Sequence, residues 1–303
     1  MEYPFYQLRE DVCVLQGRTN TGIVKLTDSH CLLIDPGQDK DSLKPLAARL
    51  ELLKLIPSAV LITHAHADHY GACYYLKNKT DISFYASEFE SSLIEQPLLE
   101  PIFLFGGAEP IPELMYKFIL AKPVPITGRV SAGPWSLEGK HFQIIDLSGH
   151  SPGQVGLSYA GLLFAGDSLT FKSFIDKYKF PFYSDIRKAC STLKTISNSN
   201  FDQLILGHGP LLDQKSAFEE IDFNLTYLQE FVTYVEKIVE KGPITEELLL
   251  KAVADHLVTP ITTVIQFVLN RTLVLAALKY LQESQKVVSY IDQNQWLWKT
   301  VNS

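Results

Sequence analysis

Short apolar runs bounded by turn residues recur along the first two thirds of the chain, and such runs are typical of strands. They lie at residues 12–17, 22–26, 31–35, 59–63, 82–85, 141–147, 155–159, 162–165 and 203–206. Leucines at helical spacing predict a helix over residues 39–56. Further helices are expected at residues 70–77, 87–95 and 185–197. Two successive halves of strands followed by helices predict a layered α/β fold.

Residues 96–130 interrupt this pattern. The segment carries six prolines and the pair Gly106-Gly107, so regular strand pairing is not expected, and a short helix is predicted at 113–120. Long irregular segments are often functional. A lid over a pocket and a surface insertion that adds stability are equally good interpretations.

From Asp213 onward the pattern becomes helical. Helices are predicted at residues 213–240, 246–256 and 260–282, followed by a terminal hairpin built from residues 287–290 and 296–299. Three helices and a hairpin resemble a small winged-helix domain. We therefore expect a catalytic domain over residues 1–212, with 96–130 as a lid-like insertion, and a helical domain over 213–303.

Composition narrows the class of protein. The chain has 303 residues and a formal net charge of −7, which counts against general affinity for nucleic acid or for an anionic membrane. No uninterrupted apolar run approaches the roughly 20 residues of a membrane span. The four cysteines are scattered, and we expect no secretory signal, because the first residues have no basic region that leads into an apolar stretch. We expect a cytoplasmic protein with reduced thiols.

Three histidines and an aspartate stand together directly after the apolar run 59–63, in the stretch His64-Ala65-His66-Ala67-Asp68-His69. Imidazole and carboxylate groups are the ligands expected for zinc, manganese or iron. Buried polar groups without partners are costly, so four of them at the end of a core strand need a partner. The pattern predicts a metal centre and therefore an enzyme.

Three more polar residues follow predicted strands. His150 lies in Gly149-His150-Ser151-Pro152-Gly153, Asp167 follows Gly166, and His208 stands between Gly207 and Gly209. Small neighbours allow the backbone to approach a shared centre. One such histidine is usually structural. Three sites of this kind beside the His-rich loop favour common metal ligation.

This ordered set of motifs resembles the metallo-β-lactamase superfamily over roughly residues 10–210. The resemblance implies an αββα four-layer sandwich with metals at one edge of two sheets. It also implies that His64, His66 and His150 hold one metal, that Asp68, His69 and His208 hold the other, and that Asp167 bridges them. The cysteine ligand of some β-lactamases and the glutamate of the di-iron oxygen reductases do not occur in this set.

A hydroxide shared by two divalent cations can attack a carbonyl or phosphoryl centre. We expect zinc, with iron and manganese open. The His-x-His-x-Asp-His loop is similar to that of glyoxalase II-like thioesterases, so a small ester, thioester or lactone is the leading substrate. Asp68 is the candidate for a catalytic proton relay, and a purely ligating role is an equal alternative.

Other residues receive supporting roles. Asp35 ends the strand 31–35, and the resemblance implies that it lies beside the metals and orients a ligand. A turn-forming aspartate before Pro36 is the alternative. Lys172 and Tyr178 follow Asp167 and are candidates for binding an anionic substrate group, although a solvated loop is also consistent with this segment.

Three alternatives remain open. Some relatives with a winged-helix-like tail cleave RNA, but acidic residues outnumber basic ones after residue 213, which makes a phosphodiesterase or endoribonuclease less favoured. A single iron could support a persulfide dioxygenase, and a non-catalytic metal scaffold is the remaining class. We expect a small-molecule substrate, with the tail packing beside the pocket or forming a homodimer interface.

Overall fold

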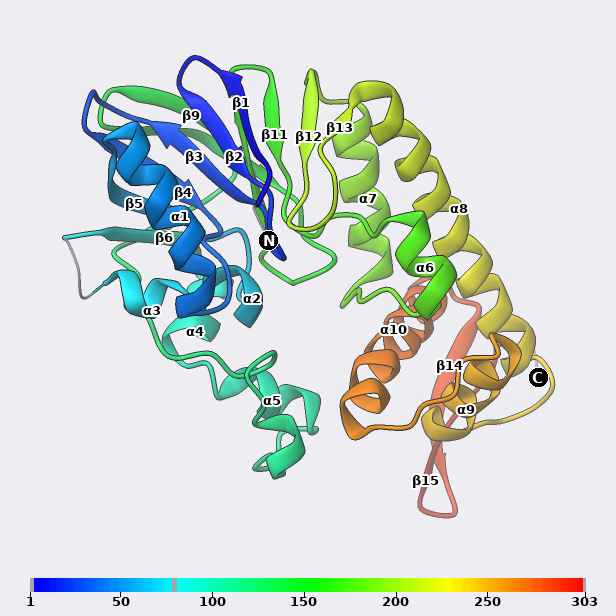
Figure 1. The fold of residues 1–303 in the computed structure, drawn as a ribbon. Helices are drawn as coiled ribbons and strands as arrows, with labels where there is room; N and C mark the ends of the chain where they lie inside the picture. The colour runs from blue at the N-terminus through cyan, green and yellow to red at the C-terminus, as the bar shows by residue number, and fades with distance from the viewer. Residues whose placement is uncertain (1–2, 78–80, 302–303) are drawn as a thin grey trace. The chain divides into compact units, whose positions relative to one another are not determined.

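The computed structural model describes residues 3–77 and 81–301, which form two compact units (Figure 1). The first unit contains the described residues up to Ser148, together with Pro152–Ser168 and Asn198–Ala217. The second contains Gly149–Ser151, Leu169–Ser197 and the described residues from Phe218 onward. Both large sheets therefore belong to the first unit, and most helices of the C-terminal half belong to the second.

The first sheet has seven strands in the order of the sequence. They are β1 (Phe5–Arg9), β2 (Val12–Leu15), β3 (Thr21–Lys25), β4 (His30–Ile34), β5 (Ile56–Leu61), β6 (Ser83–Ser87) and β7 (Gly128–Val130). Strands β1 to β4 pair antiparallel, whereas β4 to β7 pair parallel. The carboxyl ends of β4 and β5 consequently lie at one edge, which is where the His-rich loop begins.

The second sheet has six strands and is also mixed. They are β8 (Gly133–Leu137), β9 (Lys140–Asp146), β10 (Val155–Tyr159), β11 (Leu162–Phe164), β12 (Gln203–Ile205) and β13 (Leu212–Asp213). Only β11 and β12 pair parallel. The loops after β9, β11 and β12 carry the three later candidate ligands.

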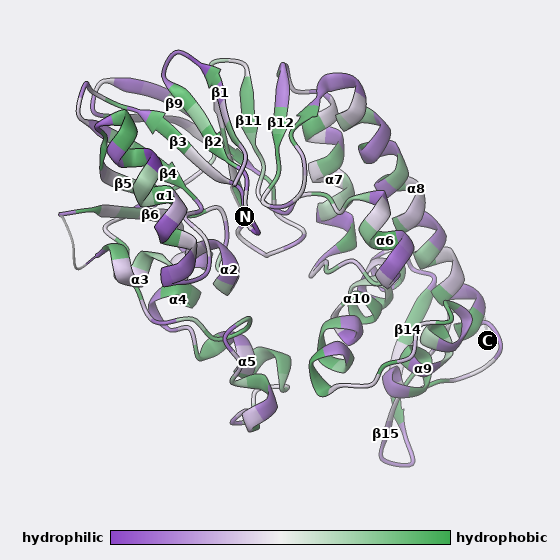
Figure 2. Cartoon of the chain, in the orientation of Figure 1, coloured by the Kyte–Doolittle hydropathy of each residue, from purple (hydrophilic) through white to green (hydrophobic). Residues whose placement is uncertain are grey.

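The two sheets pack face to face because successive side chains of each strand point to opposite faces of its sheet. Val12 and Val14 of β2 join one buried cluster with Phe142 and Leu157 of the second sheet. The neighbouring Cys13 points to the other face and joins a cluster with the buried leucines of α1 (Lys40–Leu53). In Figure 2, β3 and β11 are largely hydrophobic, whereas α8 (Gln214–Val239) alternates between hydrophobic and hydrophilic residues. A helix layer and two sheets of the expected sandwich thus lie in the first unit.

The remaining helices of the first unit are short: α2 (Ala67–Tyr70), α3 (Cys73–Leu76), α4 (Glu88–Glu95), α5 (Leu99–Leu104) and the 3-10 helix η1 (Pro112–Leu114). The helix predicted at 113–120 is therefore wrong. Prolines on both sides leave room only for η1 and a turn in which Leu120 N–H bonds to the Tyr116 carbonyl. The expectation that 96–130 avoids strand pairing is also wrong at its end, because β7 pairs with β6.

The second unit contains four further helices and a hairpin: α6 (Lys172–Tyr178), α7 (Ile186–Ser197), α9 (Glu246–His256), α10 (Val264–Glu283), β14 (Val287–Asp292) and β15 (Gln295–Thr300), in addition to most of α8. The predicted helices and terminal hairpin are confirmed. α10 begins at Val264 rather than at residue 260, because Thr263 and Gln266 form a reciprocal capping box. Residues 172–178 are helical rather than a loop.

Helix α10 is long and apolar enough to span a membrane by length and composition. Arg271 and Lys279 divide this apolar stretch, so the sequence predicted no apolar run of that length. Leu273, Ala277 and Leu281 are fully buried, and α10 contacts α7 and α9. These contacts are those of a core helix within the second unit.

Candidate metal centre

The His-rich loop connects β5 to α2 at the edge of the first sheet. His64 follows the strand, His66 is the residue before α2, and Asp68 and His69 lie in the single turn of that helix. The side chains of His64 and His69 are completely buried. Burial of two imidazoles at the end of a core strand requires that their ring nitrogens find partners.

Asp35, at the end of β4, supplies the outer partner of this loop. Its carboxylate accepts hydrogen bonds from Thr63 N–H at 2.8 Å, from Thr63 Oγ1 at 2.6 Å and from His69 Nδ1 at 2.8 Å. Since Thr63 Oγ1 donates to Asp35, it accepts from His64 Nδ1 at 3.0 Å. Both histidines therefore carry their proton on Nδ1 and present the Nε2 lone pair to the interior of the site.

Asp68, Asp167 and His208 meet His69 on one side of the site. His208 Nδ1 donates to the Arg18 carbonyl at 2.5 Å, so its Nε2 faces inward, 3.2 Å from Asp68 Oδ2 and 3.4 Å from Asp167 Oδ2. The other Asp167 oxygen, Oδ1, lies 3.4 Å from His69 Nε2. Candidate ligand atoms of Asp68, His69 and His208 all lie within 4.8 Å of one another.

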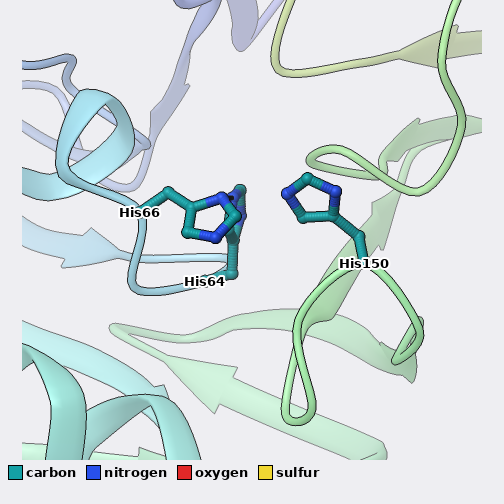
Figure 3. A group of neighbouring side chains, drawn as sticks. All are labelled: His64, His66 and His150. Carbon is teal, nitrogen blue, oxygen red and sulfur yellow. Dashed lines mark hydrogen bonds between the residues drawn. The ribbon is translucent and has the colours of Figure 1, made fainter. Parts of the chain in front are cut away.

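His64, His66 and His150 form the second group, with candidate ligand atoms also within 4.8 Å of one another. Their rings point toward one another in Figure 3. His64 Nε2 lies 3.0 Å from His66 Nδ1. His150 belongs to the loop between β9 and β10, and its Nδ1 lies 2.9 Å from the Phe182 carbonyl, which leaves Nε2 as its inward nitrogen.

The donors that the structure presents fit metal cations. Among the described residues, His69 Nε2 is buried and accepts no hydrogen bond, although the Asp167 carboxylate is near. The space beside it depends on Gly207, because a Cβ there would lie 2.3 Å from Asp167 Oδ1 and 2.4 Å from His69 Cε1. Inward imidazole nitrogens and carboxylate oxygens are the donor set of zinc, iron or manganese.

The electrostatics of the site favour bound positive charge. The Asp167 carboxylate raises the pKa of His208 far above its usual value. Burial alone would lower the pKa of His69, but the charges of Asp167 and Asp35 outweigh it and raise that pKa as well. Burial opposes ionisation of Asp167, yet His208 and His69 hold its pKa well below the usual range. Metal ions compete with protons for these nitrogens, so metal binding releases protons.

A buried glutamate that the sequence analysis missed joins two of the ligand loops. Glu90, on α4, is fully buried, and its carboxylate accepts hydrogen bonds from Ala65 N–H and from Gly153 N–H, both at 2.8 Å. Ala65 lies between His64 and His66, and Gly153 ends the loop that carries His150. No motif distinguishes Glu90 in the sequence. The one available signal is an acidic residue on the apolar side of a predicted helix.

Two uncharged residues position the later loops in a similar way. Asn20 Nδ2 donates to the carbonyls of Leu206 and Gly209, on both sides of His208. Gln154 is fully buried and accepts from Asp167 N–H at 3.3 Å, while its amide nitrogen donates to Ser168 Oγ. These side chains fix the backbone from which the candidate ligands project.

The predicted substrate residues lie in the second unit. Lys172 Nζ is 2.7 Å from Asp176 on the same helix, and the ring of Tyr178 packs against Phe174. Their assignment to substrate binding stays a prediction. His30 and His141 lie away from this cluster, beside serine or threonine hydroxyls, and His256 stacks on Tyr234.

Comparison with known proteins agrees with this geometry. The family model described as the metallo-beta-lactamase superfamily matches residues 14–208. The probable metallo-hydrolase YqgX of Bacillus subtilis (strain 168) is 29% identical over 150 residues, which are 48% of this chain and 63% of YqgX, less than two thirds of its length. Hydroxyacylglutathione hydrolase GloC of Haemophilus influenzae is 28% identical over 204 residues, covering 66% of this chain and 90% of GloC.

Solved structures give the same result. A beta-lactamase domain protein from Burkholderia ambifaria covers 99% of this chain and 97% of its own, with a TM-score of 0.75 and 15% identity. TTHA1623, solved in a di-iron-bound form, covers 69% of this chain and 98% of its own, with a TM-score of 0.51 and 28% identity. The fold and the clustered donors agree with the family model, which matches more than half of the chain, so the chain belongs to the metallo-β-lactamase superfamily.

Proposed function

We propose that the chain is a dinuclear metal-dependent hydrolase of small thioesters, with esters and lactones as related substrates. The observation that carries this proposal is the inward orientation of the Nε2 atoms of His64, His69 and His208, each set by a hydrogen bond from the opposite nitrogen. Similarity to GloC, a hydroxyacylglutathione hydrolase, supports the thioester class.

The proposed ligand sets follow the two groups. His64, His66 and His150 would hold one ion, and Asp68, His69 and His208 would hold the other. Asp167 places one oxygen toward His69 and the other toward His208, which suits a ligand of the ion in that group. We propose that it is also shared with the other ion, as the family resemblance implies. Asp35 also lies near His64 and His69. We assign it an orienting role, because its oxygens already accept three hydrogen bonds.

Bound divalent cations activate water as a nucleophile near neutral pH and polarise the carbonyl oxygen of the substrate. The protein's own residues supply orientation and proton handling. Burial disfavours the Asp68 carboxylate, but His208 and His69 lower its pKa to about 2, so it is ionised at neutral pH. We propose that Asp68, in addition to serving as a ligand, relays a proton during collapse of the tetrahedral species: it takes the proton of the hydroxyl group that was added and passes it to the leaving thiolate, so that a carboxylate and a thiol are released.

Zinc is the proposed native metal, because histidine-rich sites with carboxylates suit it. The di-iron-bound form of TTHA1623 supports iron as the second candidate. Elemental analysis of the protein purified without added metal tests the identity. Two zinc ions per chain would support the proposal. One iron ion per chain, or a metal content made up of neither zinc nor iron, would contradict it.

The activity is tested by a substrate panel with zinc, manganese and iron loadings. We expect hydrolysis of acyl thioesters to exceed that of bis-phosphodiesters, and we expect His66→Ala to abolish it without unfolding the protein. His30→Ala, at the start of β4 and away from the candidate ligands, is the matched control and should retain activity. Cleavage of labelled single-stranded RNA alone, or oxygen consumption with persulfides, would replace the proposal by one of the alternatives.

The domain boundary at residues 212/213, the lid role of 96–130 and the winged-helix character of the tail remain proposals of the same kind. A small-molecule substrate, a cytoplasmic location and a homodimer formed through the tail are further expectations. Sedimentation of the purified protein tests the dimer, and a uniformly monomeric species would contradict it.

A further inference from the structure

A cavity of about 450 Å³ opens directly beside the candidate metal centre, within the first unit. Asp68 and His208 form one end of it. The remaining wall comes from the loop between β2 and β3, from the start of α1, and from residues 117 and 118 of the irregular segment. A substrate bound to the metals would extend into this space.

Most of the charged groups that line this cavity already have partners. Asp39 caps α1 by accepting from Asp41 N–H and Ser42 N–H, and it lies 3.6 Å from Lys117 Nζ. Asp41 lies 2.7 Å from Lys44 Nζ. The acidic residues at the start of α1 are therefore largely neutralised by neighbouring cations and amides.

Arg18 is different. Its side chain is exposed at the cavity and forms no ion pair within residues 3–77 and 81–301. Its carbonyl accepts the hydrogen bond from His208 Nδ1, so the guanidinium is carried by the same residue that orients a candidate ligand. A guanidinium fits a carboxylate in a bidentate manner, and this pairing is stronger than one between neutral groups.

The irregular segment contributes apolar surface to the cavity. Phe118 lines it, and the Lys117 carbonyl accepts from Gln38 Nε2 at 3.1 Å, which ties this segment to the loop after β4. A cation at the rim, an aromatic ring in the wall and metal-site residues at the end match a short carbon chain that ends in a carboxylate.

Building on the proposed hydrolase function, we propose that this cavity binds the carboxylate of a carboxylate-bearing thioester, and that Arg18 is the residue that recognises it. The carboxylate can belong to the acyl group or to the thiol leaving group. Both sources present the same chemistry to Arg18, so the experiment separates them.

The test compares two matched pairs of thioesters with the metal-loaded enzyme. Succinyl and butyryl thioesters differ on the acyl side, and thioesters of 3-mercaptopropionate and propanethiol differ on the leaving-group side. We expect kcat/KM to be about 10- to 100-fold higher for the charged member of one pair, the range of a charge-assisted interaction. Because Arg18 is exposed, added salt should reduce that ratio.

Arg18→Met should bring the ratio close to one. Arg49→Met is the matched control, because Arg49 lies over the Phe5 ring rather than at this cavity, and its ratio should equal that of the unchanged protein. As a readout that needs no turnover, calorimetry should show that the protein binds succinate more tightly than butyrate, and that Arg18→Met removes the difference.

The outcomes are distinct. A ratio that depends on Arg18 supports the inference, and the pair in which it occurs identifies the charged side of the substrate. Hydrolysis of all four thioesters without preference, or a preference that survives Arg18→Met, overturns the inference and leaves the proposed function intact. Absence of hydrolysis with every thioester overturns the proposed function and this inference with it.

Discussion

Two clusters of charged side chains lie at opposite ends of strand β9. The candidate metal centre lies beyond the carboxyl ends of β5 and β9, whereas Asp11, Lys140 and Tyr159 meet near the starts of β2 and β9. In the second cluster Asp11 accepts from Lys140 Nζ and from Tyr159 OH, and Lys140 also donates to Tyr159 OH. The charges of Asp11 and Lys140 therefore neutralise each other within this cluster.

The metal centre is built in the opposite way. Hydrogen bonds there engage the outer nitrogens of His64, His69 and His208 and leave inward nitrogens facing one another and two carboxylates. The Asp11 cluster neutralises its own charges and links the two sheets. In the metal centre the hydrogen-bond partners of the histidines lie on the outside, so the inward nitrogens and carboxylates are positioned to bind cations. The direction of the outer hydrogen bonds, rather than the residue types, separates structural from functional polar groups.

The same substitution made in each cluster gives the largest contrast. Asp167→Asn removes a negative charge that lies beside both His69 and His208, so we expect loss of bound metal. Removing a hydrogen-bond partner of a metal ligand typically costs roughly 10–100-fold, and we expect kcat to fall by more than that in Asp167→Asn. Asp11→Asn should leave kcat unchanged. Hydrolysis assays with metal analysis check both variants. Comparable losses of activity would erase the distinction between the clusters.

Metal removal should destabilise the protein only when the metal centre is intact, and it should not depend on the Asp11 cluster. A ligand at 100 times its Kd stabilises the folded state by about 2.7 kcal/mol, so chelation should lower the unfolding temperature of the unchanged protein. Chelation should lower the unfolding temperature of Asp11→Asn by the same amount and should change that of Asp167→Asn little. Calorimetric melts with and without chelator measure this. A chelator-independent melting temperature in the unchanged protein would show that the cations add nothing to stability.

Glu90→Gln tests whether outer hydrogen bonds control metal affinity. The amide cannot accept from both Ala65 N–H and Gly153 N–H without one close donor–donor contact, so we expect affinity to fall roughly 10–100-fold. Glu88→Gln, on the same helix but exposed, is the control. Competition with a chromophoric chelator gives the affinities. Equal values for the two variants would mean that Glu90 supports folding alone.

The smallest effect concerns acid stability. Burial opposes ionisation of Asp11, but Lys140 and Tyr159 outweigh it and lower its pKa. A lowered folded-state pKa contributes stability that is present above the unfolded value and is lost as pH falls through the folded value. Asp11→Asn should therefore cost roughly 1 kcal/mol near pH 7 and nothing at strongly acidic pH. Urea unfolding across pH 2–7 measures the difference, and a pH-independent cost would contradict it.

The sequence predicted nine of the thirteen strands described in the two large sheets and most helices, and it missed β1, β7, β8 and β13. It predicted the seven candidate ligands because each follows an apolar run and carries a distinctive side chain. His208 shows this, since its glycine neighbours mark a close approach. The orienting role of Asp35 was expected, but its three hydrogen bonds become visible only when β4 and β5 pair in parallel.

The residues that the sequence did not reveal act through distant contacts. Glu90 reaches Gly153, 63 positions away, and Asn20 reaches Gly209, 189 positions away. Neither has a local pattern, because the partner is a backbone group rather than a matching side chain. The prediction of a helix at 113–120 was wrong for a local reason, because prolines limit the helix to η1.

The proposed chemistry requires two cations between the inward nitrogens and the carboxylates. Anomalous diffraction from crystals grown with metal tests this directly. We predict two peaks, one bounded by His64, His66 and His150 and one bounded by Asp68, His69 and His208, with Asp167 between them. Metal-loaded crystals with no peak at either position would contradict the account.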